Sequence, residues 1–163
     1  MKLSAGLEWA LHCCVVLSVA DQPVPVTTLA ELHDVSSTYL AKQMQALSGA
    51  GIVASTQGRA GGYVLTKAPK DITVLDIVEA VDGSHAAYTC TEIRQRGPLA
   101  ATPEACRSVC AINKAMLDAD RAWRASLKSV TIADLARSVR RNYDDDVMGI
   151  VRGWLSDQRA VQT

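Results

Sequence analysis

The stretch "YLAKQMQALSGAGIVASTQGRAGGYVLTK" (residues 39–67) decides the fold of this chain. Apolar residues recur at helical spacing as far as Leu47, and a short glycine-containing exit then leads into an apolar run that ends near Thr56. A glycine-rich turn, "QGRAGG", separates that run from a second short strand, "YVLTK". The pattern predicts a helix over Ser37–Gly49 followed by a β-hairpin.

Two further helices are predicted upstream of this stretch. The first spans Ser4–Ala20 and is apolar on both faces, so we expect it to contact something besides its own domain. The second spans Thr28–His33 with Thr27 as its N-cap, and the turn "DVSS" connects it to the helix that begins at Ser37. The order helix, helix, turn, helix, hairpin predicts a winged helix-turn-helix.

Downstream, Thr73 caps a helix that runs through Val81, and Thr131 begins another. Between them, Thr102-Pro103 begins a long helix that extends to about Lys128. Its apolar stripe has the 3–4 spacing of helix-on-helix packing across a dimer and consists of Val109, Ile112, Met116, Ala119, Trp123 and Leu127. The predicted fold class is therefore mainly α with a small β-hairpin, a winged helix-turn-helix domain plus a long dimerisation helix.

Four segments are expected from these boundaries. They are a winged helix-turn-helix domain at 1–82, a long loop at 83–102, the dimerisation helix with a following short helix at 103–141, and a weakly helical C-terminal tail at 142–163. Loops as long as the second segment are usually functional or disordered.

Charge and cysteine usage bound the class of protein. Lys and Arg together number 17, as do Asp and Glu, so bulk positive charge does not indicate nucleic-acid binding and any DNA contact must come from local placement. Five cysteines are an odd, unevenly placed set, which is typical of a reducing cytoplasm rather than a secreted disulfide framework. We expect no signal peptide and no membrane-spanning segment, and therefore a cytoplasmic protein.

The second helix of a helix-turn-helix enters the major groove of double-stranded DNA, where Lys and Gln read base edges and hydroxyl groups contact phosphates. The candidates on this helix and its cap are Ser36, Ser37, Thr38, Tyr39, Lys42, Gln43 and Gln45. On the wing, Gln57 and Arg59 are candidates for backbone or minor-groove contact. The alternative is a solvated helix face beside a flexible hairpin tip.

Residues 39–67, together with "ITVLDIVEAVDG" (residues 72–83), resemble the Rrf2 family of regulators, of the IscR/NsrR type. The similar features are a tyrosine-leucine recognition helix, a wing that ends in Gly-Gly-Tyr and the Ile-Thr-Val-Leu-Asp-Ile opening of the next helix. The resemblance as a whole extends over roughly residues 1–140. The resemblance implies a homodimeric DNA-binding transcription factor, here a repressor, with redox-sensing members closest. The family wing often has Arg where Gln57 stands and Pro where Arg59 stands, so the wing contact is re-aimed here.

Family members that carry an iron–sulfur cluster bind it with three loop cysteines and a fourth ligand, either a His after the third Cys or an Asp from the partner's first helix. Cys90 matches the first cysteine and Cys110 the third, whereas Asn113 occupies the His position and the middle cysteine has no match. In "GLEWALHCC" (residues 6–14), Glu8 stands where the Asp is found, and His12 lies one turn further along, about 5–6 Å away. Resemblance and spacing together predict a 2Fe–2S cluster at the dimer interface, held by Glu8, His12, Cys90 and Cys110. Residues 83–102 are then expected to be a cluster-binding loop.

Other thiol arrangements stay open. Cys106 lies one turn before Cys110 and is an alternative ligand, which would give a three-thiolate set with His12 or Glu8. The same fold is also compatible with a thiol- or zinc-based regulator that has no cluster, because Cys106 and Cys110 suit a shared metal better than a disulfide. Cys13 and Cys14 are predicted to be small core residues.

An iron–sulfur electron carrier or enzyme is the remaining alternative. The sequence has no Gly-rich nucleotide loop after a strand and no nucleophile–base signature, so we predict that the protein is not an enzyme. Trp9, next to Glu8, is a candidate switch relay because a large side chain beside the site must repack if the ligand helix moves; plain burial at the subunit interface is the alternative. His33 and His85 have no partner in the sequence and are expected to be structural or solvent-facing.

Overall fold

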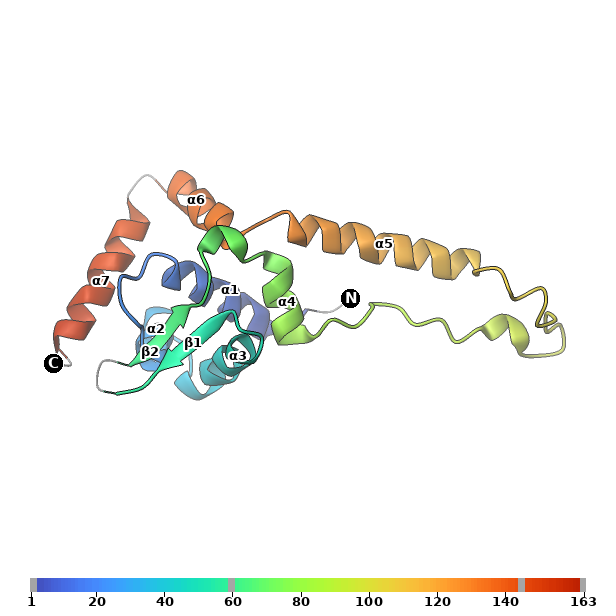
Figure 1. The fold of residues 1–163 in the computed structure, drawn as a ribbon, viewed down its shortest axis with the longest axis horizontal. Helices are drawn as coiled ribbons and strands as arrows, with labels where there is room; N and C mark the ends of the chain where they lie inside the picture. The colour runs from blue at the N-terminus through green and yellow to red at the C-terminus, as the bar shows by residue number, and fades with distance from the viewer. Residues whose placement is uncertain (1–2, 59–60, 144–145, 162–163) are drawn as a thin grey trace. The chain divides into compact units, whose positions relative to one another are not determined.

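A computed structural model describes residues 3–58, 61–143 and 146–161 of the chain (Figure 1). It divides into two compact units, one formed by the described residues up to Ser84 together with Leu127 onward, the other by His85–Ser126. The elements are α1 (Ala5–Leu17), α2 (Val26–Leu32), α3 (Ser37–Gly49), β1 (Val53–Thr56), β2 (Gly62–Leu65), α4 (Val74–Asp82), α5 (Ala111–Lys128), α6 (Ile132–Asn142) and α7 (Val147–Val161), with single 3₁₀ turns at Pro69–Asp71 and Ile93–Gln95. The predicted fold class, mainly helical with one antiparallel hairpin, is confirmed.

The core of the larger unit is built around α1, which packs against α3 and α4. Ala10, Cys13 and Cys14 on α1 are completely buried. Leu40 on α3 and Ile77 on α4 are equally buried, because both helices turn an apolar stripe toward α1. Small buried residues therefore allow α1 to pack closely against α3, the predicted recognition helix.

The wing is a two-stranded sheet in which Val53 lies opposite Leu65 and Thr56 opposite Gly62. Near the turn of the hairpin, β2 is attached to the segment between α1 and α2, since Val24 N–H donates to the Tyr63 carbonyl (3.0 Å) and Tyr63 N–H donates to the Val24 carbonyl (2.8 Å). A Cβ at Gly62 would overlap the Val24 carbonyl group, so this close approach requires glycine. The second strand is thus held at both edges.

Two matching capping boxes lie side by side where α4 and α6 begin. Thr73 Oγ1 accepts from Asp76 N–H and Thr131 Oγ1 accepts from Asp134 N–H, while each aspartate accepts in return from its threonine N–H. Val74 N–H donates to the Val130 carbonyl across the gap between them (2.9 Å). Both helix starts predicted from the sequence, at Thr73 and Thr131, are confirmed.

Two other helix starts differ from expectation. α2 begins at Val26 with Pro25 as its N-cap, rather than at Thr28 with Thr27 as the cap, because the extended backbone of Pro25 leads directly into the helix and its carbonyl accepts from Leu29 N–H. The long helix begins at Ala111 rather than at Thr102-Pro103. Residues 102–106 form a single turn, after which the carbonyls of Cys106 and Ser108 accept hydrogen bonds from Arg94 and not from the next turn of a helix.

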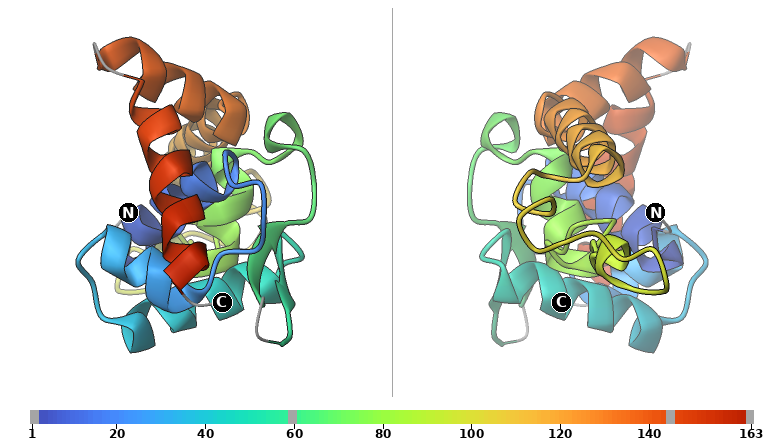
Figure 2. Two further views of the ribbon diagram at one scale, coloured as in Figure 1. Left: turned by 90° about the vertical axis from the view of Figure 1, so that its left-hand side faces the viewer. Right: turned by 90° about the vertical axis from the view of Figure 1, so that its right-hand side faces the viewer.

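The C-terminal tail, expected to be weakly helical, contains the 15-residue helix α7 in its described part. α7 lies beside the segment that joins α1 to α2 (Figure 2), where Arg152 Nε donates to the Val19 carbonyl and Arg159 Nη1 donates to the Pro23 carbonyl. Met148 is buried at 4% exposure. Tertiary contacts of this kind stabilise helices whose intrinsic propensity is modest.

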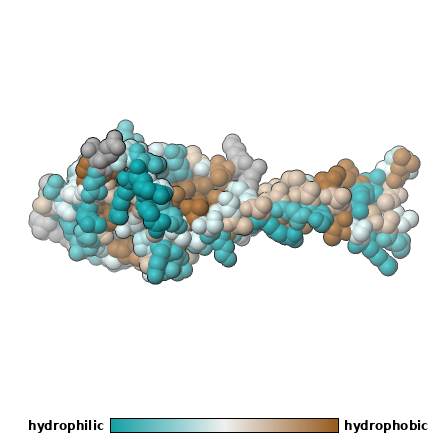
Figure 3. Space-filling view, turned by 90° about the horizontal axis from the view of Figure 1, so that it is seen from above, coloured by the Kyte–Doolittle hydropathy of each residue, from teal (hydrophilic) through white to brown (hydrophobic). Residues whose placement is uncertain are grey.

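The apolar stripe of α5 is uncovered. On α5, Ile112 is 65% exposed and Met116 is 39% exposed. Val109, which was predicted to belong to this stripe, precedes the first residue of the helix and is 64% exposed. No residue of α5 is buried in the structure as described, and the space-filling view from above shows apolar (brown) atoms at the surface in this part of the chain (Figure 3). None of the helices in the described ranges combines the length and apolarity needed to span a bilayer.

Replacing Thr131 by alanine removes the side-chain acceptor at the start of α6 and leaves Asp134 N–H without it. Loss of an N-cap costs about 1 kcal/mol, so we expect the free energy of unfolding to fall by about that amount. Chemical denaturation of Thr131→Ala against Thr131→Ser, which keeps the hydroxyl, measures the difference. Equal stability of the two variants would contradict the role of this capping box.

Candidate functional site

α3 has one apolar and one polar face, as expected of a recognition helix. Its inner face packs on α1 and α2, and its first turn is capped by Ser36 Oγ, which accepts from Tyr39 N–H (3.5 Å). Tyr39 is 42% exposed although it belongs to a residue type that is commonly half-buried. Of the expected contacts on this helix and its cap, the structure exposes Ser36, Thr38, Tyr39, Lys42 and Gln45 and half-buries Ser37.

Gln43 lies on the inner face and not on the exposed one. Its side chain is 7% exposed and rests against Gly6 of α1, where a Cβ would lie 2.5 Å from Gln43 Cδ. Gln43 follows Leu40 by three residues and precedes Leu47 by four, so the helical spacing already places it among the buried positions. The burial of Gln43 against α1 therefore argues against the expectation that its side chain contacts DNA.

The wing presents Gln57 at the exposed end of β1. Arg59, the other wing candidate, lies outside the described residues. A Cβ at Gly61 would overlap the Thr56 carbonyl, which explains why glycine follows the tip of this hairpin. The wing and the exposed face of α3 are both parts of the larger unit.

The face of α1 opposite the core carries Glu8, Trp9 and His12. Glu8 and His12 are exposed, whereas Trp9 is half-buried. A carboxylate and an imidazole at positions i and i+4 lie above one another on one side of the helix. This side of α1 is open in a single chain, which agrees with the expectation that the helix contacts something besides its own domain.

His33, at the C-terminal end of α2, has a partner that its place in the sequence does not reveal. Its ring lies 5.5 Å from the ring of His12 and 6.3 Å from that of Trp9, centroid to centroid. His33 Nε2 is buried with no hydrogen-bond partner among the described residues. Burial, and secondly the proximity of His12, lower the pKa of His33, so the neutral ring is favoured.

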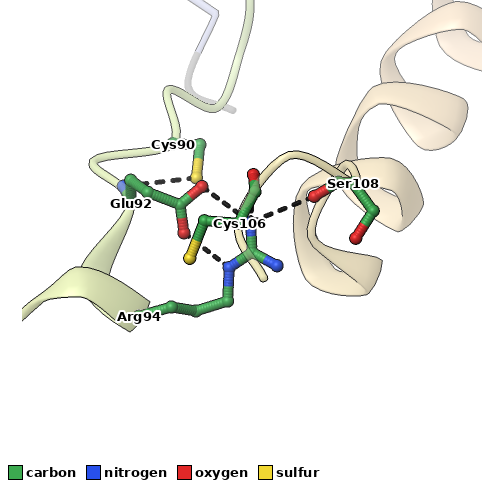
Figure 4. Close-up of polar contacts among 5 residues, drawn as sticks. All are labelled: Cys90, Glu92, Arg94, Cys106 and Ser108. Atoms are coloured by element: carbon green, nitrogen blue, oxygen red, sulfur yellow. Dashed lines mark hydrogen bonds and ion pairs between the residues drawn. The ribbon is translucent and has the colours of Figure 1, made fainter. Parts of the chain in front are cut away.

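The cysteine loop is organised by an arginine (Figure 4). The guanidinium of Arg94 binds both carboxylate oxygens of Glu92, at 2.5 and 2.8 Å, and also donates to the carbonyls of Cys106 (3.5 Å) and Ser108 (3.1 Å). Glu92 N–H in turn donates to Cys90 Sγ (3.4 Å). We call this set of bonds the Arg94 bridge; it joins the Cys90 segment to the segment that leads to Cys110.

Neither Glu92 nor Arg94 was singled out by the sequence. Within "TCTEIRQRG" (residues 89–97) they have the appearance of ordinary loop charges. The carbonyl groups that accept from Arg94 lie 12 and 14 residues further along the chain. Planar guanidinium groups suit this role because they donate in several fixed directions at once. A pair of opposite charges close to a cysteine was the one available signal.

Cys110 lies at the start of α5, where backbone N–H groups are unpaired. Hydrogen bonds from the N–H groups of Asn113 and Ile112 lower the pKa of the Cys110 thiol, and Arg94 contributes in the same direction. The thiolate, which is the form that binds metals, is thereby favoured. Cys90 and Cys106 are half-buried, so all three loop thiols are accessible.

Cys13 and Cys14 differ from the loop thiols in every respect. Both are completely buried, and burial raises the pKa of each to about 12. They are small core residues, as predicted, and not ligands.

The predicted ligands are divided between the units. Glu8 and His12 belong to the larger unit, whereas Cys90, Cys106 and Cys110 belong to the unit of residues 85–126. Within neither unit do three His, Cys, Asp or Glu side chains of the described residues gather closely enough to hold a metal ion.

Comparisons with known proteins agree with this arrangement of elements. Residues 3–138 match the family model described as Rrf2, "Iron-dependent Transcriptional regulator". Among curated relatives, the protein rrf2 of Nitratidesulfovibrio vulgaris is 32% identical over 84% of this chain and 88% of its own length. The transcriptional repressor NsrR of Streptomyces coelicolor is 30% identical over 83% of this chain and 88% of its own length.

A solved structure has the same fold. CymR of Bacillus subtilis, whose structure is described as that of a global cysteine regulator, superposes with a TM-score of 0.68 at 25% identity, covering 85% of this chain and 98% of CymR. The family and these relatives are transcriptional regulators and not enzymes. With its family match over most of the chain, its capped recognition helix and its wing, this chain belongs to the Rrf2 family of winged-helix, DNA-binding transcriptional regulators.

Proposed function

We propose that this protein is a homodimeric cytoplasmic repressor that senses redox state through a 2Fe–2S cluster at the dimer interface. Glu8 and His12 of one subunit and Cys90 and Cys110 of its partner are the proposed ligands. The coarser function, DNA-binding regulation of transcription, is that of the family.

The observation that carries the proposal is that the chain displays two accessible partial donor sets. One is the exposed pair Glu8 and His12 on α1, and the other is the group of loop thiols held by the Arg94 bridge, with Cys110 favoured as thiolate. Two thiolates, an imidazole and a carboxylate are a donor set that suits iron. Because three donors do not gather within either unit as described, a site shared between subunits is the arrangement that we favour.

The uncovered stripe of α5 supports the homodimer. Val109 and Ile112 expose about two thirds of their surface, which is costly in water for two large apolar residues. A second copy of the same helix offers a complementary apolar stripe with the spacing of coiled-coil packing. The cysteine loop immediately precedes this helix, so dimerisation would bring loops and partner subunits together.

A 2Fe–2S cluster supplies reversible one-electron redox chemistry, and ligation by histidine in place of cysteine makes reduction easier. His12 and Glu8 hold their positions through α1, whose opposite face packs directly on the recognition helix α3. Trp9 and His12 both contact His33, which lies at the end of α2 four residues before α3 begins. A change in the position of α1 is therefore passed to the DNA-contacting helix, and Trp9 is the proposed relay.

A thiol- or zinc-based regulator on the same fold is the second candidate. It is favoured by the lowered pKa of Cys110 and by the position of Cys106 within the same Arg94 bridge. Cys106 then becomes a ligand or a reactive partner of Cys110. The two candidates differ in metal content and colour, which can be measured directly.

Protein purified without oxygen is expected to show a visible absorption band that bleaches with dithionite and returns in air, with about two iron and two sulfide per subunit. Glu8→Ala, His12→Ala, Cys90→Ala and Cys110→Ala should each lose most of this band, since each removes a ligand. His85→Ala is the matched control, because it changes an exposed histidine that is not a proposed ligand. Colourless protein with stoichiometric zinc, bound through Cys106, would establish the second candidate instead.

Arg94→Gln removes the donor that joins the two cysteine segments while leaving every proposed ligand in place. Loss of a group that orients metal ligands through hydrogen bonds typically weakens metal binding by about tenfold or more, so we expect faster release of iron to a chelator by a similar factor. Arg96→Gln, an exposed arginine in the same loop, is the control. Identical rates of iron release from both variants would show that the Arg94 bridge does not stabilise the metal site.

Trp9→Ala is expected to keep the absorption band and lose the effect of redox state on DNA affinity, because Trp9 contacts His33 without being a ligand. The measurement compares the dissociation constants of oxidised and reduced protein for a DNA fragment selected by the protein itself. Trp154→Ala on α7, which is similarly half-buried, serves as control. A full redox response in Trp9→Ala would show that Trp9 is only buried at the interface.

A further inference from the structure

Within the larger unit, α7 and the segment that joins α1 to α2 enclose a cavity of about 280 Å³. Its walls include Pro23, Val24 and Pro25 from that segment and Leu155 from α7, and Gly61 at the turn of the wing also lines it. None of the proposed cluster ligands lines this space. Its volume is slightly below the range of typical small-molecule pockets, which starts at about 300 Å³.

Two arginine side chains, one near the middle of α7 and one near its C-terminal end, attach this helix to the segment that joins α1 to α2. Arg152 and Arg159 are seven residues apart and so lie on the same side of α7, two turns from each other. Arg152 Nε donates to the Val19 carbonyl (3.1 Å) and Arg159 Nη1 donates to the Pro23 carbonyl (3.2 Å). Leu155 and Ser156 lie between these two anchors and leave the space beneath them unfilled.

The charge of the lining favours an anion. Among the described residues that line the cavity, Arg152, Arg159 and Asp21 are charged, so positive charge is in excess there. Arg152 Nε lies 3.8 Å from Asp21 Oδ2, which is an ion pair without a hydrogen bond, and Asp21 is 70% exposed. A competing carboxylate that approaches from the cavity can therefore form the bidentate contact that Asp21 does not.

The remaining wall favours a small apolar body. Prolines, Val24 and Leu155 give an apolar surface, and unfilled space beside such residues forfeits dispersion contacts that an occupant would restore. We propose that this cavity binds a small carboxylic acid with an apolar aryl or alkyl group, with Arg152 contacting the carboxylate and Leu155 and Val24 the apolar group.

An occupant of the cavity would lie against the segment that is hydrogen-bonded to the second strand of the wing. Val24 forms one wall, and the same residue is bound to Tyr63 of β2 through two hydrogen bonds. Ligand binding would therefore influence how the wing is held, and through it the affinity for DNA. This consequence rests on the DNA-binding function, whereas the binding site itself does not depend on the cluster.

The test uses phenylacetate and hexanoate as probes on the full chain, with phenylacetamide as the uncharged counterpart, followed by saturation-transfer NMR and calorimetric titration. For ligands of this size we expect a dissociation constant of about 1 mM for the acids and at least about tenfold weaker binding of the amide. Leu155→Trp fills the cavity and should abolish binding of both acids. Arg152→Gln should abolish the preference for acid over amide, whereas Arg140→Gln, an exposed arginine on α6 outside the cavity, should leave it unchanged.

Two results would overturn the proposal: absence of saturable binding of either acid, or binding that persists unchanged in Leu155→Trp. If Leu155→Trp fails to fold, Arg152→Gln alone decides, because a retained preference for the acid would exclude the assigned contact. DNA affinity is then measured with and without phenylacetate. If phenylacetate binds and DNA affinity does not change, the proposed coupling between the cavity and the wing is wrong. Loss of the visible absorption band in the same protein bears on the proposed cluster and not on this cavity.

Discussion

The close packing of α1 against α3 and α4 is the constraint on which the rest of the structure depends. Ala10, Cys13 and Cys14 are small enough to let the helices approach closely, and all three are completely buried. One face of α1 therefore positions the recognition helix, while the other face presents Glu8 and His12. A single rigid element links the proposed sensing residues to the surface that contacts DNA, because a helix cannot move one face without the other.

The cysteine loop is held together by different means. It has no apolar core, and no residue of α5 beside it is buried in the described structure. Its order comes from polar bonds, above all those of Arg94 to Glu92 and to the carbonyls of Cys106 and Ser108. Such a segment is locally ordered and open to change at its thiols, which suits a region that acquires its full set of contacts from a partner subunit or a bound group.

The larger unit gains a second possible input through α7. This helix encloses a cavity against the same segment that anchors the wing, on the opposite end of α1 from Glu8. Two signals, one at each end of α1, would then act on one winged helix. In physical terms they act on different contacts: the packing of α1 on α3 in one case, and the hydrogen bonds between Val24 and Tyr63 in the other.

The sequence alone was sufficient for the winged helix. The spacing of Leu40, Met44 and Leu47, the glycine-rich turn and the threonine caps at 73 and 131 are local signals, and local signals fix helix starts, helix faces and hairpins. It was also sufficient to separate Cys13 and Cys14 from the loop thiols by helical spacing. The pair Glu8 and His12 was proposed from helical spacing together with the resemblance to a family that places a ligand on this helix.

Tertiary structure decided the rest. The contact of His33 with His12 and Trp9 and the Arg94 bridge join residues that are distant in sequence. The Arg94 bridge also binds the carbonyls of Cys106 and Ser108, which precede the late start of α5, and the arginines of α7 bind carbonyls of the segment that joins α1 to α2. Sequence periodicity reports which face of an element is apolar; which partner that face or that side chain meets is decided only when the chain is folded.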